Sequence, residues 1–329
     1  MMTSKTDPLR TRWLTDQGRH GTLADEVLRR LVARRSLNKL GLPYHDGLLD
    51  LRYLPGPIPQ PGTRYEAAGV VIQELTGTLE LRKAKLVGLD LSGAELRSTR
   101  FHDSVIENCR FEKTGCQDWR LWATEVKDCS FARANFHKSG VGTWHGRRRN
   151  TWRRISFVGA DFRVMAAWAA IFEDCDFSNA KLSGTSFEQC NLTRRTFRGK
   201  VKNVAFDCRQ LDHRPHCHPM TDVDFTEARF ADVEFIGTDL GAVKLPNDPD
   251  VRLIKNYRAV ITTALDLLGN DNSVPSRLMR AEFENSLRMM RGAVRDHVFT
   301  RRDYLDCAGG IDLADFAEAL LNRATNSIQ

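Results

Sequence analysis

Apolar side chains recur at every fifth position through the middle of the chain. Thirteen consecutive fifth positions from 81 to 141 are all apolar, and the period returns in three shifted frames that end near residue 245. In many repeats a small side chain stands two residues before the large one. Helices space apolar residues by about 3.6 and strands by 2. A period of five therefore predicts neither a helix nor a long strand.

The spacing inside each repeat indicates how the chain folds. Residues two apart share a face of an extended chain, so each repeat is expected to be a short extended segment followed by a corner. Such a chain winds into a solenoid, with unpaired edges only at its two ends. Fourteen of the 17 Phe residues stand at central positions. The predicted core consists of Phe101, Phe111, Phe131, Phe136, Phe157, Phe162, Phe172, Phe177, Phe187, Phe225, Phe230 and Phe235.

Segments such as Ala134-Asn135-Phe136 and Cys175-Asp176-Phe177 carry a resemblance to a known family. The pattern resembles the pentapeptide repeat family, whose motif is roughly Ala-(Asp/Asn)-(Leu/Phe)-X-X. The resemblance covers about half of the chain and implies a mainly β fold, a right-handed quadrilateral β-helix with four five-residue faces per coil. The 29 central positions then imply about seven coils. We expect a helical and linker segment over 1–65, the β-helix over 66–246 and an α-helical region over 247–329.

Four residues depart from the repeat. Trp119, Met165, Arg195 and Arg209 occupy positions where a small side chain is expected. A buried, unpaired charge is costly, so we expect these faces to be distorted or to face solvent next to a loop.

The segment before the repeats predicts a cap for the solenoid. Residues 22–40 read as an amphipathic helix that Thr22 caps and Gly41 ends. An open solenoid end needs a cap, and this helix is our candidate. The proline-rich stretch 55–62 suits an extended linker. The apolar stretch 70–72 is then expected to start the β-helix.

Helical spacing replaces the five-residue period after Pro246. Apolar stripes starting at Ile254, at Met279 and just after Asp312 predict three helices. These helices could bury a small core of their own, cap the rod or form a homodimer interface, and the sequence leaves these alternatives open.

The first interruption of the period, near 142–154, is rich in arginine and tryptophan. It contains five Arg, two Trp and no acidic residue. Such residues dominate protein interfaces and also suit phosphate contacts and base stacking. The alternative is a solvated loop whose tryptophans pack on the rod. The candidate partner-binding residues are Trp144, Arg147, Arg148, Arg149, Trp152, Arg153 and Arg154.

The second interruption, near 212–221, is rich in histidine. Zinc favours four His or Cys ligands, but the spacing is not that of a standard finger, so a polar loop is the stronger interpretation and no cofactor is expected. The weak metal candidates are Cys208, His213, His216, Cys217 and His218. The sequence shows no catalytic constellation and no phosphate-cradling or HExxH motif. We therefore do not expect an enzyme.

Composition and charge narrow the class of protein. The 329 residues are 41% hydrophobic with a net charge of +7, which excludes a disordered chain. No apolar run approaches the ~18 residues of a membrane span, and the polar N-terminus predicts a cytoplasmic protein with reduced thiols. Residues 79–246 hold 27 basic and 22 acidic residues, and five of the basic ones stand in the first loop. The rod itself is therefore neutral, and a neutral rod is a weak mimic of a polyanion.

The family resemblance implies a function. The best-understood pentapeptide repeat proteins bind DNA gyrase and related type II topoisomerases, and some confer quinolone resistance. Those resistance proteins carry inward cysteines and two loops, and this chain shares the arrangement through Cys109, Cys129, Cys175 and Cys190. The leading hypothesis is a non-catalytic protein-binding scaffold with a topoisomerase among its candidate partners. The alternatives are a nucleic-acid-binding module that uses the Arg/Trp loop, and a small-molecule role for the C-terminal helices.

Overall fold

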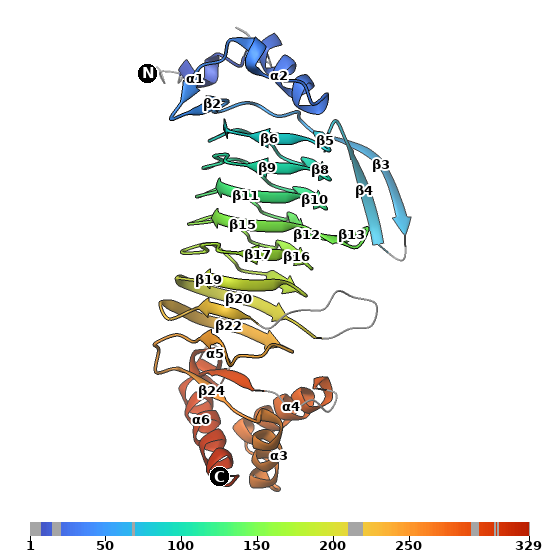
Figure 1. Ribbon diagram of the computed structural model, residues 1–329. Coiled ribbons are helices and arrows are strands. Elements are labelled where there is room, and N and C mark those ends of the chain that lie inside the picture. Colours follow the sequence, from blue (N-terminus) through green and yellow to red (C-terminus); the bar gives the residue numbers. More distant parts are fainter. Residues whose placement is uncertain are drawn as a thin grey trace, which may run out of the picture.

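The chain winds into a rod of stacked coils with helices at both ends (Figure 1). The computed structural model describes residues 8–14, 21–67, 70–209, 220–290, 296–305, 307 and 309–328. Two parallel eight-stranded sheets form two sides of the rod. The first face consists of β5 Glu80–Arg82, β8 Arg100–His102, β10 Arg120–Trp122, β12 Gly140–Gly142, β16 Ala166–Trp168, β18 Thr185–Glu188, β20 Gly199–Asp207 and β22 Ala228–Ile236. The second face consists of β6 Lys85–Val87, β9 Val105–Glu107, β11 Glu125–Ser130, β15 Thr151–Ser156, β17 Ile171–Glu173, β19 Asn191–Thr196, β21 Thr221–Asp224 and β23 Val243–Lys244.

Single backbone bridges form the other two sides. The third face runs through parallel bridges from Asp90 to Arg110 and on to Thr196. The fourth face runs from Pro55 through Glu95 to Lys181, and residues 199–202 of β20, paired with 228–231 of β22, continue it. Each step along the first strands is 20 residues, as from Arg100 to Arg120. The chain is therefore a four-sided β-helix, as the family resemblance implies.

The corners between faces use left-handed backbone. The residue two positions after a central side chain has a φ near +50 to +60°, as at Lys113 (56°), Asp118 (57°) and Asp128 (54°). This region suits Gly, Asn and Asp, and glycine occupies it at Gly88 and Gly93. The polar corner residues of the repeat are therefore explained by backbone conformation as well as by exposure.

The interior of the rod is a continuous stack of aromatic rings and small side chains. Of the twelve predicted core phenylalanines, Phe235 is partly buried and the others are at most 1% exposed. The small polar side chains donate to a carbonyl of the preceding coil: Thr114 Oγ1 lies 2.7 Å from the Leu91 oxygen, and Thr185 Oγ1 lies 2.7 Å from the Phe162 oxygen. This bond satisfies the hydroxyl groups inside an apolar core.

Three of the four departures from the repeat point inward. Trp119, Met165 and Arg195 are 0%, 2% and 1% exposed, so the expectation that they face solvent is wrong. Trp119 fits because its Nε1 donates to the Leu96 oxygen at 2.6 Å and its ring packs edge-on against neighbouring phenylalanines. Arg209 is half-buried and forms a two-pronged ion pair with Asp207.

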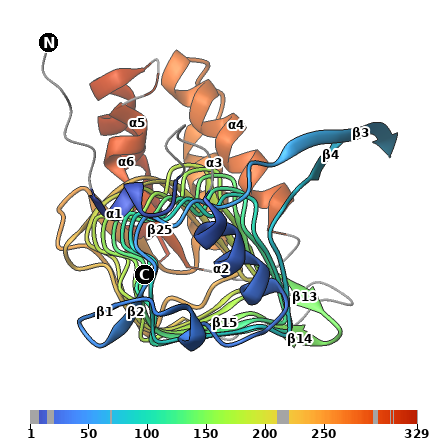
Figure 2. The ribbon, with the colours of Figure 1, turned by 90° about the horizontal axis from the view of Figure 1, so that it is seen from above.

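A short helix covers the N-terminal end of the rod (Figures 1 and 2). This helix, α2, spans Thr22–Val32 and is followed by a 3-10 helix at Asn38–Leu40, so the predicted helix over 22–40 is too long. Gly21, and not Thr22, occupies the N-cap position, and no side chain caps the helix. The buried Val27 and Leu31 belong to the hydrophobic core of the rod. The helix therefore buries apolar residues at the end of the solenoid, as an end cap must.

The rod begins earlier in the chain than the repeats indicated. Strand β2 (Leu48–Asp50) pairs with β1 (Tyr44–His45) on one side and with β7 (Leu89–Asp90) of the rod on the other. Pro55 bridges to Glu95, so part of the expected linker is backbone of the rod. Residues 70–72 lie in β4 (Val70–Thr76), which pairs antiparallel with β3 (Gln60–Ala67). The expectation that this stretch starts the β-helix is wrong, because it forms a projecting hairpin (Figure 2).

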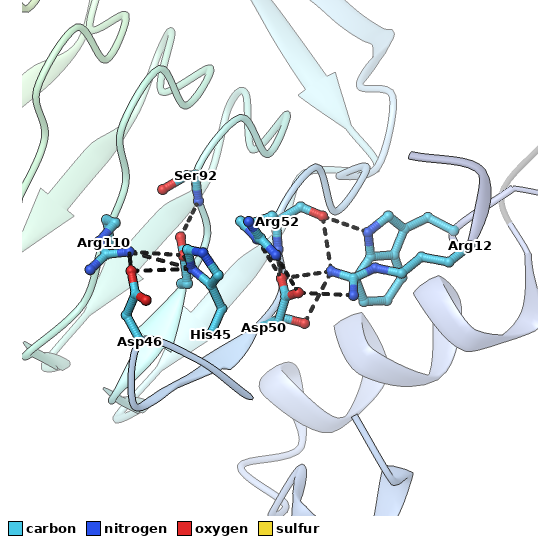
Figure 3. A network of polar contacts seen from close by, with 9 residues as sticks. Arg12, His45, Asp46, Asp50, Arg52, Ser92 and Arg110 are labelled. Atoms are coloured by element: carbon cyan, nitrogen blue, oxygen red, sulfur yellow. Dashed lines mark hydrogen bonds and ion pairs between the residues drawn. The ribbon is translucent and has the colours of Figure 1, made fainter. Parts of the chain in front are cut away.

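A polar network ties Arg12 and Trp13 to the first coil (Figure 3). Arg12, next to helix α1 (Pro8–Thr11), donates from Nη2 to Asp50 Oδ1 at 2.8 Å, and Arg52 Nη2 lies 2.9 Å from Asp50 Oδ2. The buried Trp13 donates from Nε1 to the Arg52 oxygen at 2.7 Å. Asp50 is 3% exposed, so its two arginines neutralise a carboxylate that water does not reach.

A second buried carboxylate lies beside it. Asp90 is 0% exposed. Its Oδ2 lies 2.8 Å from His45 Nδ1 and 3.4 Å from Arg110 Nη1. Arg110 also reaches Asp46 at 3.1 Å, so one arginine joins the β1–β2 turn to the third face of the rod.

Asp50 predicts a pH-dependent attachment of the N-terminal segment. Burial alone would raise the pKa of Asp50, but hydrogen bonds from Arg52 and Arg12 outweigh it and hold the pKa well below its usual range. Because the folded pKa is depressed, the stabilisation is complete above the unfolded pKa of about 3.9 and is lost as pH falls towards the folded pKa. Asp50→Asn is expected to lower the unfolding free energy by about 1–2 kcal/mol at pH 7. Urea unfolding should show that the difference in unfolding free energy between the wild type and Asp50→Asn becomes smaller from pH 5 to pH 2. A difference that does not depend on pH would contradict the assignment.

The C-terminal region has its own hydrophobic core. It contains α3 (Tyr257–Leu268), α4 (Val274–Met289), α5 (Arg301–Leu305), α6 (Gly310–Asn326) and the antiparallel pair β24 (Val251–Ile254) and β25 (His297–Thr300). Ile261, Phe283 and Leu321 are buried in a cluster separate from that of the rod. Of the three alternatives, the structure supports both a core of their own and a cap, because Val298 of β25 is buried in the core of the rod. The homodimer interface stays a prediction. Arg302 joins them to the rod through Asp248 and the Phe230 oxygen.

Candidate functional site

The first interruption of the rod is a short β-hairpin. Strands β13 (Trp144–His145) and β14 (Arg148–Arg149) pair Trp144 with Arg149, and they leave the stack at one corner (Figures 1 and 2). The turn residues Gly146 and Arg147 both have positive φ, 55° and 61°, as a two-residue hairpin turn of type I′ requires. Gly140 pairs with Ala166, 26 residues on, instead of 20. Six inserted residues therefore build the hairpin, and the register of β12 against β16 shifts between Gly140 and Gly142 beside it.

The hairpin and the second face enclose a shallow groove. The groove has a volume of about 390 Å³ and is lined by Trp144, Arg147 and Arg148 from the hairpin and by Glu125 and Ile171 from the rod, among others. Trp144 is half-buried, and the guanidinium carbon of Arg149 lies 5.8 Å from its ring centroid, within the range of a cation–π contact. The groove therefore combines an aromatic ring and exposed arginines from the hairpin with the carboxylate of Glu125 and the half-buried Ile171 from the rod.

Three of the five arginines of this segment already bind acidic residues of the rod. Arg148 Nη1 lies 2.7 Å from Asp103 Oδ1, and Arg154 Nε lies 2.6 Å from Asp128 Oδ1. The hydrogen bond from Arg154 lowers the pKa of Asp128 below its ordinary value. The basic loop of the sequence is therefore much less positive in the fold than its composition indicates.

Arg153 is the third of these arginines. It lies between two acidic residues, with Glu125 at 3.3 Å and Glu173 at 2.8 Å. The second face continues this pattern, because Lys127 pairs with Glu107 at 3.0 Å. Ion pairs thus join successive coils along this face, with the two cations Lys127 and Arg153 next to each other between Glu107 and Glu173.

Trp152 does not belong to the exposed site. It is 0% exposed, and its Nε1 donates to the Val141 oxygen at 3.1 Å inside the rod. Trp152 is the central residue of a repeat in β15, so a partner could reach its ring only by opening a coil. Here the alternative interpretation, a tryptophan that packs in the rod, is correct.

The sequence analysis missed the acidic partners of the arginines. Asp103, Asp128 and Glu173 come from neighbouring coils. A 20-residue step predicts Glu173 as a neighbour of Arg153, but the six-residue insertion places Asp128 26 residues before Arg154 and Glu125 28 residues before Arg153. The register across the insertion was the missing information.

The second interruption lies almost entirely outside the described residues. This holds for His213, His216, Cys217 and His218, and only Cys208 of the metal candidates is described. Cys208 is buried and disulfide-bonded. A disulfide sulfur does not serve as a thiolate ligand, and the expectation of reduced thiols is wrong at this position. Within the described ranges no cluster of three His, Cys, Asp or Glu is arranged to hold a metal ion.

The inward cysteines are free and buried. Cys109, Cys129, Cys175 and Cys190 all carry free thiols inside the rod. Burial raises the pKa of Cys175 and of Cys190 to about 12, which keeps both protonated at neutral pH. These residues therefore act as small apolar side chains.

Among the described helices, none is long and apolar enough to cross a membrane.

Comparison with known proteins agrees with this geometry. A family model described as pentapeptide repeats matches eight copies over residues 80–112 and 170–194. No curated protein matches the chain.

Solved structures of similar proteins include a trypsin-treated form of QnrB1, titled a plasmid-mediated fluoroquinolone resistance protein. It is 15% identical over 51% of this chain and 81% of its own, with a TM-score of 0.28. HetL, titled a pentapeptide repeat protein involved in heterocyst differentiation regulation from Nostoc sp. strain PCC 7120, is 13% identical over 68% of this chain and 97% of its own, with a TM-score of 0.29. Scores this low carry no argument about function. The matched segments and the four five-residue faces of the coil show that this chain carries pentapeptide repeats folded as a four-sided β-helix.

Proposed function

We propose that the protein is a non-catalytic scaffold that binds a partner protein through the β13–β14 hairpin. The observation that carries this proposal is the insertion itself, which places the half-buried Trp144 and the exposed Arg147 at the rim of a groove on a rigid rod. Binding residues are commonly held on loops that a rigid framework positions. Trp and Arg are also the residue types most often found at the energetic centre of an interface.

Arg147 is the strongest single contact in this proposal. Within the described part of the chain, its guanidinium takes part in no ion pair, in contrast to Arg148, Arg153 and Arg154. Its backbone is fixed by the hairpin turn. A partner carboxylate or carbonyl would therefore meet a cation whose main chain is already ordered, which lowers the entropy lost on binding.

The partner class to test first is a type II topoisomerase, with protection from its inhibitors as the biological effect. The family resemblance supports this choice, together with the inward cysteines and the projecting hairpin. The charge of the rod supports it less, because the ion pairs along the second face leave that face nearly neutral. We therefore assign recognition to the hairpin and not to mimicry of the DNA backbone.

Nucleic-acid binding by the same segment is the second candidate. Its basis is the density of Arg and Trp in the insertion, which suits phosphate contacts and base stacking. The acidic partners of Arg148, Arg153 and Arg154 reduce the positive charge that phosphates could meet. This hypothesis predicts an affinity that falls steeply with salt, and salt-independent binding would exclude it.

The test is a gyrase supercoiling assay with a quinolone. Micromolar wild-type protein is expected to raise the drug concentration that gives half inhibition, and Trp144→Ala with Arg147→Ala is expected to weaken this effect at least tenfold, as loss of an interface centre does. Lys113→Ala is the matched control, because Lys113 is also an exposed corner cation with positive φ.

The outcomes separate the two levels of the proposal. If the wild-type protein has no effect in the supercoiling assay, the topoisomerase is excluded as the partner. If affinity purification from the native organism then recovers the same partner with the double variant as with the wild type, the hairpin is not the contact.

A further inference from the structure

Four cations gather on the fourth face near the C-terminal end of the rod. Lys181, Lys200, Lys202 and Arg229 are all exposed, and we call them the lysine patch. Lys200 pairs in register with Arg229 on the next coil. Lys200 and Lys202 stand two residues apart on β20 and therefore point to the same side. The patch thus spans three successive coils on a face that the hairpin does not occupy.

The cations of the patch have no acidic partners in the described structure. No ion pair there involves any of the four, whereas Lys127 and Arg153 of the second face both pair with acids. The acids on which two of these cations act already have other partners. Asp161, which feels Lys181, binds Arg163 through both oxygens at 2.9 and 2.7 Å, and Asp248, which feels Arg229, binds Arg302 at 3.0 Å. Like charges on neighbouring coils repel, so the patch favours an external anion.

A hollow lies among these side chains. It has a volume of about 380 Å³ and is lined by Lys181, Lys200 and Lys202 together with Asn179, Leu182 and Ser183. Leu182 itself is buried. The hollow therefore combines three ammonium groups with two uncharged polar side chains that can donate hydrogen bonds.

We propose that the lysine patch binds an extended acidic segment of a partner protein. Carboxylates at every second residue of an extended chain are about 6.6–6.8 Å apart, the same separation as Lys200 and Lys202 on their strand. Four cations match a short acidic segment, whereas a DNA duplex presents one charge per ~1.7 Å and typically engages six to ten cations. This inference deepens the proposed scaffold role by naming the chemistry of a second contact.

The test uses a fluorescein-labelled hexaglutamate peptide in an anisotropy titration of the full chain. The triple variant K181E/K200E/K202E is expected to bind it at least tenfold more weakly than the wild type. The control K83E/K113E/K138E makes the same change of net charge at three exposed corner lysines, and it is expected to change the affinity less than twofold. Circular dichroism verifies folding, and K200A/K202A replaces the triple variant if that variant does not fold.

Three results would overturn the inference. These are no measurable binding of the peptide to the wild type, an equal loss in the control, and a 12-base-pair duplex that binds the patch more tightly than the peptide. The first two exclude the site, and the third assigns it to nucleic acid. The hairpin proposal is judged by the supercoiling assay and this one by the loss of peptide binding in the lysine-patch variant relative to its control, so failure of either proposal is distinguishable from failure of the other.

Discussion

Phe131→Ala is expected to lower the free energy of unfolding by about 3–5 kcal/mol. Phe131 is 0% exposed and lies in the middle of the aromatic stack. Its ring is parallel to that of Phe111 at 4.6 Å and lies 5.8 Å from that of Phe157, one coil on each side. Alanine removes both contacts and leaves a cavity that the flanking coils cannot close, because their hydrogen-bonded backbones fix the spacing of the rungs.

Guanidinium unfolding followed by circular dichroism measures this effect. In a solenoid each coil contacts only its neighbours, so the damage is also expected to break cooperativity, with the coils on the two sides of residue 131 melting in separate steps. Val87→Ala is the control, since Val87 is an outward side chain of the same rod and 52% exposed. It should change stability by less than about 0.5 kcal/mol. A Phe131→Ala effect as small as that of the control would mean that the stack does not stabilise the rod.

The sequence was sufficient to predict the rod because its information is local and repeated. A large side chain every five residues, with a small one two positions earlier, specifies the interior of each face without knowledge of any distant contact. The start of the rod was missed for the same reason. Leu49 and Leu51 are 5% and 0% exposed in a coil made before the repeats become regular, and only the pairing of β2 with β7 reveals it.

The candidate site was less predictable because its charges are set by register. The composition of the insertion indicates a basic loop, yet Arg153 and Arg154 stand in β15 and meet acids of the coils on either side. The hairpin tip could be located from the break in the period. The ion pairs with neighbouring coils decide which arginines remain available to a partner. The sequence does not specify these pairs, because the insertion interrupts the period. The lysine patch was missed likewise, since its members come from separate coils.

Arg195→Met is expected to stabilise the protein, by about 1–4 kcal/mol. Arg195 is 1% exposed at a position where the repeat holds a small side chain, one coil after Cys175. Its Nη1 donates to the Arg194 oxygen at 3.2 Å, while its Nε and Nη2 have no hydrogen-bond partner in the described structure. Burial lowers the pKa of Arg195 to about 10. A lowered pKa means that the fold disfavours the charged form, and the cost is fully present at pH 7, below the folded pKa.

Methionine has a similar length, no charge and the flexibility to fill an irregular space, so it removes the unsatisfied groups without opening a large cavity. Arg194→Met is the matched control, because Arg194 is the adjacent arginine but is exposed and paired with Asp174 at 2.6 Å. It should change stability by no more than about 1 kcal/mol. Guanidinium unfolding at pH 7 should give a higher midpoint for Arg195→Met than for the wild type. A lower midpoint would contradict this prediction. It would show that interactions of the guanidinium inside the rod stabilise the fold by more than the free-energy cost of burying its charge.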